Sequence, residues 1–120
     1  DKHEEYLGLR PATDANGCLQ DIHWSHGSFG YFPTCSLGSV MASQLCNAAE
    51  DDIGNIYGKV RDGDFEALQT WLREHIHEHG SRFETNDLVR EATGEDFTAD
   101  YFVDYVRSKY GDLYDLEESV

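Results

Sequence analysis

After Pro33, apolar residues recur every three or four positions, which is the spacing of one face of an amphipathic helix. This spacing predicts a long helix over residues 37–60. Gly54 and Gly58 weaken its last turns, so we expect the helix to break there. The residues on the apolar face, expected to lie in the core, are Leu37, Val40, Met41, Leu45, Ala48, Ala49, Ile53, Ile56, Tyr57 and Val60.

Three shorter helices are predicted further along the chain. The first covers residues 65–79, with Asp64 as its N-cap and Gly80 as its C-terminal stop. The second lies near residues 86–93, and the third begins at Thr98. The residues expected to be buried by these helices are Phe65, Leu68, Leu72, Ile76, Leu88, Val89, Ala92, Tyr101, Phe102, Tyr105, Val106 and Tyr110.

No segment alternates long enough with the period of two that a half-buried strand requires. The fold class is therefore predicted to be all-α, with about four helices in a single domain over residues 1–120. A short helix end before Pro11 precedes them. Residues 17–34 form an irregular, Gly-rich segment, unusually long for a loop in so small a domain, and such loops are commonly functional.

The net charge of the chain bears on its partners and its environment. Twenty-four acidic residues oppose nine Lys and Arg, for a net charge of −15. This field repels phosphate backbones and anionic membrane surfaces, so we expect neither nucleic-acid nor membrane partners. Acidic residues occur in every part of the chain, and high salt screens their mutual repulsion. This indicates a protein of a salt-rich cytoplasm, that is, a halophilic one, and an acidic face for a cationic partner is the alternative.

Other features bear on location and completeness. No apolar run reaches the roughly 20 residues of a membrane-spanning helix, and no signal-peptide pattern is present. The three cysteines lack the CxxC spacing of a zinc site, and free thiols fit a reducing cytoplasm. The chain begins with Asp1 rather than Met, which is consistent with a fragment.

Candidate chemistry gathers in residues 17–34, which read GCLQDIHWSHGSFGYFPT. Glycine allows close approach of backbone to a substrate, histidine can hold a proton near neutral pH, and a tyrosine hydroxyl can stabilise an oxyanion. The segment can therefore be the wall of an active site. The alternative is purely structural: Trp24, Phe29, Tyr31 and Phe32 would be core residues, with His23 a buried hydrogen-bond donor.

GCLQDIHW matches every fixed position of GxxQDxHW, and the chain here resembles the Taq (thermostable) carboxypeptidase family of metallocarboxypeptidases. Further stretches resemble the family in the same order. These are EEYLG near the start, GYFPT followed by LG, GDF to HG in residues 63–80, and ATGE to LY in residues 92–114. The resemblance therefore covers almost the whole chain and corresponds to the C-terminal part of the family.

The resemblance implies a cytoplasmic, usually homodimeric exopeptidase that releases C-terminal amino acids from peptides. It implies an all-helical, gluzincin-like fold and one divalent metal, zinc or cobalt. The HExxH helix that holds the metal lies upstream of the stretch that this chain resembles, and these 120 residues contain no HExxH. We therefore expect no metal ligands in this chain, no complete catalyst, and a partner in the N-terminal catalytic portion.

The resemblance also implies roles within the cleft. His23 of the QDxHW pattern and Tyr31 of GYFP are the candidate catalytic donors to the scissile carbonyl or oxyanion. Gln20 and Asp21 are expected to orient the loop and the His23 tautomer, as groups around metal sites do, and Trp24 to line the substrate site. The family usually has a second tyrosine where this chain has Cys35, so that position is the competing place for a catalytic phenol.

His75 to His79 spell HxxEH, a zinc-binding pattern in which two histidines on a helix hold the metal. His79 adjoins Gly80, where a histidine also suits the negative end of the helix dipole, and no third ligand lies at an evident spacing. We favour the structural interpretation. For the whole chain, a free-standing acidic helical module that only binds other proteins remains the alternative to part of a carboxypeptidase.

Overall fold

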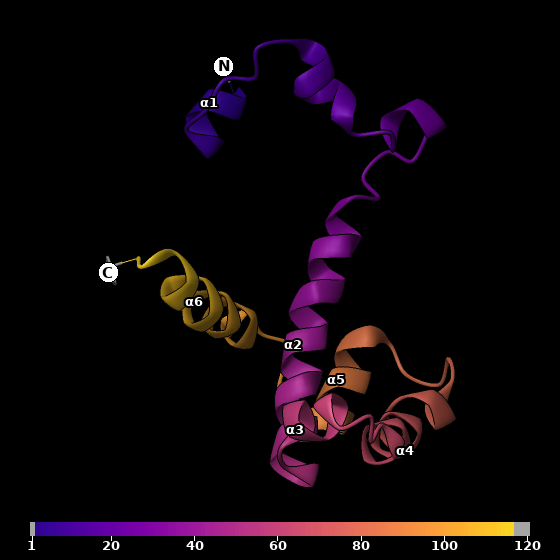
Figure 1. Ribbon diagram of the computed structural model, residues 1–120. Helices are drawn as coiled ribbons and strands as arrows, with labels where there is room; N and C mark the ends of the chain where they lie inside the picture. Colours follow the sequence, from indigo (N-terminus) through magenta and orange to yellow (C-terminus); the bar gives the residue numbers. More distant parts are fainter. Residues whose placement is uncertain (1, 117–120) are drawn as a thin grey trace. The chain divides into compact units, whose positions relative to one another are not determined.

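The computed structural model describes residues 2–116, which form helices and turns without a strand (Figure 1). The predicted all-α class is confirmed for this part of the chain. The α-helices are α1 (Lys2–Leu7), α2 (Pro33–Ile53), α3 (Ile56–Arg61), α4 (Glu66–His75), α5 (Thr85–Thr93) and α6 (Asp100–Tyr114). The single-turn 3-10 helices are η1 (Asp14–Asn16), η2 (Cys18–Gln20), η3 (Trp24–His26) and η4 (His77–His79).

The chain divides into two compact units, unit 1 (Asp1–Ser36) and unit 2 (Leu37–Val120). Unit 1 contains α1, the 3-10 helices η1, η2 and η3, and the first turn of α2. Unit 2 contains the rest of α2 and the four later helices. One domain over residues 1–120 stays a prediction.

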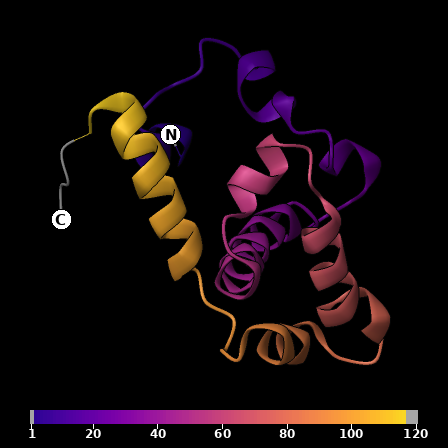
Figure 2. The same ribbon diagram turned by 60° about the horizontal axis from the view of Figure 1, so that its bottom comes forward.

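The hydrophobic core lies in unit 2, between α2, α3 and α4. Ala49, Ile56 and Trp71 are its buried members. Figures 1 and 2 show α3 and α4 beside the C-terminal half of α2. Ala49 belongs to α2, Ile56 to α3 and Trp71 to α4. The partly buried apolar residues around them are Leu45, Ala48, Ile53, Leu68, Leu72 and Ile76. The apolar face predicted for α2 and α3 is thus confirmed in the middle but wrong at Leu37, Tyr57 and Val60, which are exposed.

The predicted break in the long helix is confirmed and lies between α2 and α3. Gly54 ends α2 with φ 63°, a left-handed conformation that glycine adopts without a steric penalty. Asn55 follows with φ 47°, and its side-chain carbonyl accepts the N–H of Gly58 at 3.2 Å. That bond satisfies one of the free N–H groups at the start of α3.

The helix predicted over residues 65–79 is shorter than expected. Helix α4 ends at His75, because Ile76 leaves helical geometry with φ −124° and ψ −61°, and one 3-10 turn leads to Gly80. Asp64 accepts the N–H of Glu66 at 3.3 Å, close to the capping role predicted for it. Phe65 is exposed rather than buried, and Trp71, which the predicted apolar face omits, is the buried aromatic residue of α4.

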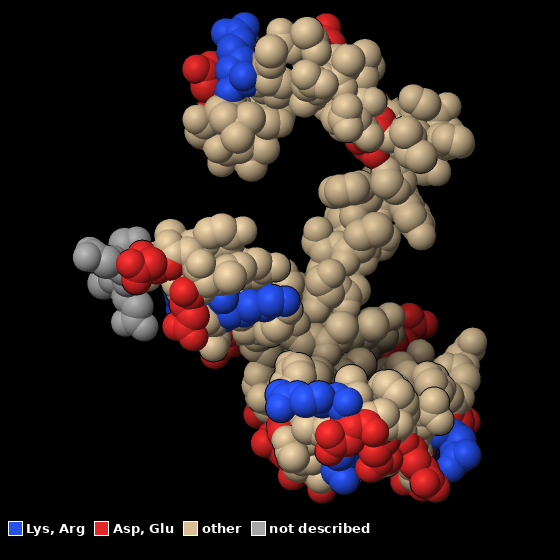
Figure 3. Space-filling view, in the orientation of Figure 1, with Lys and Arg blue, Asp and Glu red and all other residues tan. Residues whose placement is uncertain are grey.

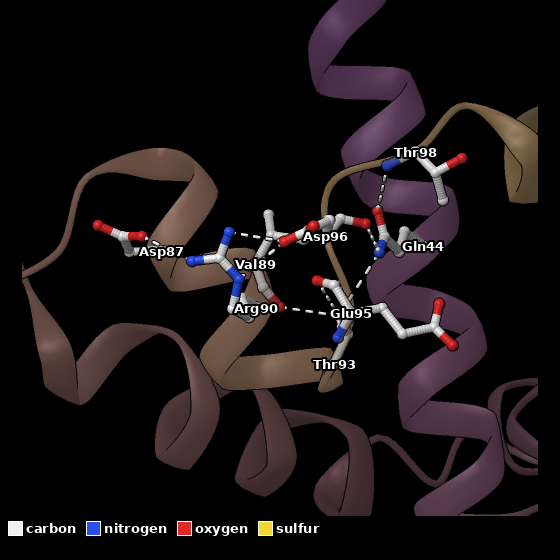
Figure 4. A network of polar contacts seen from close by, with 8 residues as sticks. All are labelled: Gln44, Asp87, Val89, Arg90, Thr93, Glu95, Asp96 and Thr98. Atoms are coloured by element: carbon white, nitrogen blue, oxygen red, sulfur yellow. Dashed lines mark hydrogen bonds and ion pairs between the residues drawn. The ribbon is translucent and has the colours of Figure 1, made fainter.

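A polar network joins α2 to the turn between α5 and α6 (Figure 4). Gln44 is fully buried, and its side chain donates to the carbonyl of Asp96 at 3.0 Å and accepts the N–H of Thr98 at 3.1 Å. Arg90 bonds Asp96 at 2.6 Å and Asp87 at 3.0 Å. The pKa of Arg90 is raised above its usual value, first by its hydrogen bond to Asp96. The turn is therefore held by hydrogen bonds to the buried side-chain amide of Gln44 and by the ion pairs of Arg90 at the surface.

The last two helices lie close to their predicted positions. Helix α5 ends at Gly94, which has φ 77° and donates its N–H to the carbonyl of Arg90 at 2.9 Å. Helix α6 begins at Asp100, whose N–H bonds the Thr98 hydroxyl at 3.2 Å. Val89 and Ala92 are buried as expected, whereas Tyr105 and Tyr110 are exposed.

Candidate active site

The GxxQDxHW segment folds as two single turns of 3-10 helix joined by a tight polar turn at Asp21. One oxygen of the Asp21 carboxylate accepts the backbone N–H of His23 at 3.1 Å. This is the local side-chain-to-backbone bond that aspartate forms readily in turns. The same oxygen contacts Nδ1 of the His23 ring. Asp21 therefore holds both the backbone and the side chain of His23.

This pairing sets the chemistry available to His23. A carboxylate accepts hydrogen bonds, so Nδ1 carries the proton that it donates to Asp21. The other ring nitrogen, Nε2, then accepts a proton when the ring is neutral and donates one when the ring is an imidazolium. The pKa of Asp21 is lowered, first by the hydrogen bond from the His23 ring and then by the bond from its backbone N–H. Asp21 is thus ionised near neutral pH.

The rings of Tyr31 and Phe32 lie against His23. Tyr31 stacks on the imidazole with ring centroids 5.8 Å apart and 28° between the planes. Phe32 approaches edge-on at 5.2 Å and 77°. The Thr34 hydroxyl donates to the carbonyl of Tyr31 at 2.6 Å, a bond at the start of α2 that fixes the tyrosine backbone. The structure therefore brings the two predicted catalytic residues, His23 and Tyr31, together.

The remaining residues predicted for the site occupy separate positions. The Gln20 side chain donates to the carbonyl of Ala15, which ties η2 back to η1. Trp24 turns to Phe29, with centroids 5.1 Å apart and 72° between the rings, and is exposed. Tyr31 and Phe32 are exposed as well. The alternative in which these aromatic residues form a core is therefore not realised within unit 1.

A hollow of about 610 Å³ opens beside this cluster within unit 1. Gln20, Asp21 and His23 line it, together with Phe32. Two further lining residues, His3 and Arg10, were not predicted. They lie near one another because α1 ends at Leu7 and the chain turns back: His3 Nδ1 lies 3.1 Å from the carbonyl of Leu9, and Arg10 lies 3.9 Å from Glu4. Nothing in their spacing along the sequence identifies them, because the turn alone brings them to the hollow.

The HxxEH pattern does not form a metal site in the structure. His75 stacks on Trp71 with centroids 4.4 Å apart, and its Nδ1 lies 2.9 Å from the Trp71 carbonyl. His79 lies beyond the end of α4, in η4, and contacts Phe83 edge-on at 5.2 Å. Across residues 2–116, no group of three or more His, Cys, Asp or Glu side chains is placed to hold a metal ion. The described residues thus do not fit the metal that the resemblance implies.

Within the same range of residues, no helix is long and apolar enough to span a bilayer. The site is a His–Asp pair that the ring of Tyr31 stacks on, and the pair lines a hollow.

Comparison with known proteins places the chain among the metallopeptidases. Residues 1–110 match the family described as Carboxypeptidase Taq (M32) metallopeptidase, and the chain belongs to this family. It is 42% identical over 113 residues to Carboxypeptidase 1 of Bacillus subtilis, and 44% identical over 110 residues to Thermostable carboxypeptidase 1 of Pyrococcus furiosus. The crystal structure of the M32 carboxypeptidase from Deinococcus radiodurans superposes with a TM-score of 0.85 at 38% identity and covers 95% of this chain.

The relatives are much longer than this chain. It spans 23% of the Bacillus subtilis protein, 22% of the Pyrococcus furiosus protein and 23% of the Deinococcus radiodurans chain. The predicted family is thereby confirmed, and so is the prediction that the match covers only part of it.

Proposed function

We propose that these residues form the substrate-facing wall of the cleft of a metal-dependent carboxypeptidase, in the C-terminal part of the enzyme. One observation carries the proposal: the QDxHW motif of the family folds into an Asp21–His23 pair that Tyr31 stacks on, beside a hollow. The substrate is a peptide from which the enzyme releases the C-terminal residue. A divalent metal, zinc or cobalt, is held by residues outside this chain, and when bound it supplies an activated water and polarises the scissile carbonyl.

The residues of this chain act on the charge that develops on the substrate. An ionised Asp21 holds the Nδ1 proton of His23 and stabilises the positive ring, from which Nε2 donates to the oxyanion. The phenol of Tyr31, which lies on the face of the same ring, is the second donor. Gln20 holds the backbone of η2 through Ala15 and thereby the turn that carries Asp21. The aromatic Trp24–Phe29 pair gives an apolar surface for the side chains of the peptide.

A chimera provides the enzyme in which to test these roles. In the grafted enzyme, this chain replaces the 113 matching residues of Bacillus subtilis Carboxypeptidase 1. His23→Ala and Tyr31→Phe each lower kcat by about 100-fold or more with smaller changes in KM, because an oxyanion donor acts on the transition state. The bound metal, measured by elemental analysis, stays at its original level.

Tyr31→Phe is the sharper substitution, because it removes one oxygen and keeps the stacked ring. Tyr114→Phe is its matched control, because Tyr114 is similarly exposed and lies in α6, outside the candidate site. A kcat for Tyr31→Phe equal to that of the control would remove Tyr31 from catalysis. Since Cys35 occupies the other place for a phenol, a separate part of the enzyme would then have to supply it.

The chain alone is expected to release no C-terminal residues in a metal-dependent way. Turnover by these 120 residues that a chelator abolishes would contradict the proposal and return His75 and His79 to the candidate ligands. The proposal also includes the homodimer expected of the family and a salt-rich cytoplasm. Sedimentation of the grafted enzyme tests the first, and the salt dependence described in the Discussion bears on the second.

A further inference from the structure

A second hollow, of about 520 Å³, lies within unit 2. Helix α2 contributes Cys46 and Glu50 to its wall, and these two residues lie one helical turn apart. Helix α6 contributes Tyr101, Asp104 and Tyr105, whose spacing of three or four places them on one face. One face of each helix therefore lines this hollow, which shares no residue with the hollow of the candidate active site.

The wall of this second hollow combines phenol rings with carboxylates, and we call it the tyrosine hollow. Tyr57 of α3 adds a third ring to the two of α6. Glu50 and Asp104 are its acidic members, and no Lys, Arg or His among the described residues lines it. The face of a tyrosine ring attracts a cation, and a carboxylate accepts hydrogen bonds from one. The wall thus favours a positively charged ligand.

The two carboxylates of the tyrosine hollow have no basic partner among residues 2–116. One oxygen of Glu50 accepts the backbone N–H of Ile56 at 2.8 Å, and Asp104 forms no hydrogen bond or ion pair within that range. Elsewhere in unit 2 opposite charges lie side by side, as Figure 3 shows on one face and as Arg90 and Asp96 do at 2.6 Å. The negative charge of the hollow is therefore left for a ligand to neutralise.

A cation of the protein itself contacts one ring of this wall. The ammonium of Lys109 lies 5.2 Å from the centroid of the Tyr105 ring and donates to its hydroxyl at 2.8 Å. The pKa of Lys109 is raised above its usual value, first by that hydrogen bond. A phenol of this wall can therefore hold an ammonium both by an N–H bond and by the ring. A quaternary ammonium, which has no N–H, could use only the ring.

The surroundings of Tyr57 favour the same charge. Its pKa is raised above the usual value, first by its electrostatic interaction with Cys46 and then by burial, with contributions from Tyr105 and Glu50. Neighbours that resist a further negative charge favour a positive one. Tyr57 thus stays a neutral phenol, whose oxygen can accept a hydrogen bond.

We propose that the tyrosine hollow binds a small organic diamine, with one primary ammonium group at Glu50 and the other at Asp104. Two carboxylates on separate helices match two charges better than one, and the volume of the hollow is in the range of small-ligand sites. The rings of Tyr57 and Tyr101 offer apolar faces to the methylene chain that joins the two groups. The site is distinct from the carboxypeptidase cleft and does not rest on the proposed function.

A titration of the 120-residue chain, followed by amide NMR, tests the proposal. Near neutral pH and at constant ionic strength, 1,4-diaminobutane shifts the amides of residues 46, 50, 57 and 105 along one saturable curve. The control is 1,4-butanediol, which has the same chain length without charge and leaves these amides unchanged. No response to the diamine, or an equal response to the diol, would overturn the proposal.

Substitutions that remove one charge separate the tyrosine hollow from the general acidity of the chain. Glu50→Gln and Asp104→Asn each weaken binding of the diamine by about fivefold, the effect of one accessible ion pair. Glu50→Gln keeps a side-chain oxygen that can accept the N–H of Ile56. Glu91→Gln is the matched control, because Glu91 is an exposed residue of α5 outside the hollow, and it weakens binding by less than about twofold. Equal weakening by all three would show diffuse attraction to an acidic chain and overturn the proposal.

The aromatic part of the wall has its own matched pair. Tyr57→Leu weakens binding of the diamine by about two- to fivefold, because it removes a ring that attracts the cation. Tyr114→Leu is the control, since Tyr114 is 65% exposed against 64% for Tyr57 and lies outside the hollow. Equal affinities of these two variants would overturn the proposed aromatic site.

The grafted enzyme distinguishes the remaining outcomes. Diamine binding by the chain that is lost in the grafted enzyme would assign the tyrosine hollow to contact with the rest of the carboxypeptidase and overturn the proposal. Binding that is retained while His23→Ala and Tyr31→Phe leave kcat unchanged would support the diamine site and refute the proposed function alone.

Discussion

The two tryptophans of this protein show how differently its two units use the same kind of residue. Trp71 of α4 is 4% exposed, and its indole N–H donates to Asp52 at 2.6 Å. Trp24 of η3 is 67% exposed and contacts Phe29. In unit 2 the aromatic residue supports the fold, whereas in unit 1 it lies on a surface beside the candidate chemistry. The lesson is that stability and function are carried by different parts of the chain.

The charges follow the same division. Unit 2 carries most of the acidic residues and the ion pairs of the α5–α6 turn, but its histidine-rich segment has no arrangement able to hold a metal among the described residues. In unit 1 the sole Asp, Glu, Lys or Arg of residues 15–36 is Asp21, which is paired with a histidine. The single charge of this segment therefore lies where the chemistry is expected.

Of the changes considered, Trp71→Ala should have the largest effect on the free energy of unfolding. Removing a buried tryptophan costs about 3–5 kcal/mol, a large part of the stability of a small domain. Chemical denaturation of the isolated chain, followed by circular dichroism, should show this loss. Trp24→Ala is the matched control and should change the free energy of unfolding by less than about 0.5 kcal/mol. Similar losses from the two substitutions would mean that unit 1 has a core of its own.

Gln44→Ala should have the next largest effect. It removes a fully buried side chain and leaves the part-buried N–H of Thr98 and the carbonyl of Asp96 without their side-chain partner, at a cost of about 1–3 kcal/mol. Asn47→Ala is a control on the same helix, because Asn47 is exposed and its side chain donates to Asp51, one turn along the helix, at 3.2 Å. Equal midpoints of denaturation for the two variants would show that the Gln44 network does not stabilise unit 2.

Salt should raise the melting temperature through many small contributions, one from each pair of like charges. Exposed pairs of charges interact by less than about 1 kcal/mol, but the repulsion within unit 2 sums over many carboxylates, and salt screens it. We expect the melting temperature of the isolated chain to rise steadily from low to molar KCl. A flat or falling profile would favour the alternative of an acidic binding surface for a cationic partner.

The pH dependence at Asp21 should be the smallest effect. Its pKa is lowered in the folded protein, so the Asp21–His23 pair adds stability above the unfolded value of about 4 and loses it as the pH falls through the lower folded value. A carboxyl-carbon NMR titration should place the Asp21 midpoint below about 4, the ordinary value of an aspartate. His23→Ala should raise the midpoint toward the ordinary range, because it removes the ring bond and keeps the backbone N–H bond. An unchanged midpoint would contradict the pairing.

Local signals in the sequence were sufficient for much of the fold. The three-four spacing predicted the helical class, and glycine at residues 54 and 94 marked two helix ends, because φ near +60° to +80° costs glycine little. Spacing failed at residue 76, where the chain leaves α4 without glycine or proline to announce it. It also failed at residues 65 and 71, where the exposed and buried aromatic positions are the reverse of those expected.

The candidate site divides in the same way. The motif alone predicted His23 and Asp21, one of the two residues expected to orient it, since Asp21 lies two residues away and a turn suffices to join them. Tyr31 stacks on His23 because the chain reverses through η3 and the turn after it. The spacing of residues in the sequence does not predict this reversal. His3 and Arg10 reach the hollow for the same reason, through a reversal of the chain after α1.

The sequence by itself therefore determined what depends on neighbours along the chain: the helices, their glycine ends, the QDxHW motif and, through them, the family. Only the tertiary structure decided which side chains are buried and which meet. Gln44 is the plainest case: its partners lie about fifty residues away, and a polar residue on a helix gives no local sign that it will be enclosed. Burial depends on which surfaces meet after the chain has folded, and periodicity records only the face that a residue occupies.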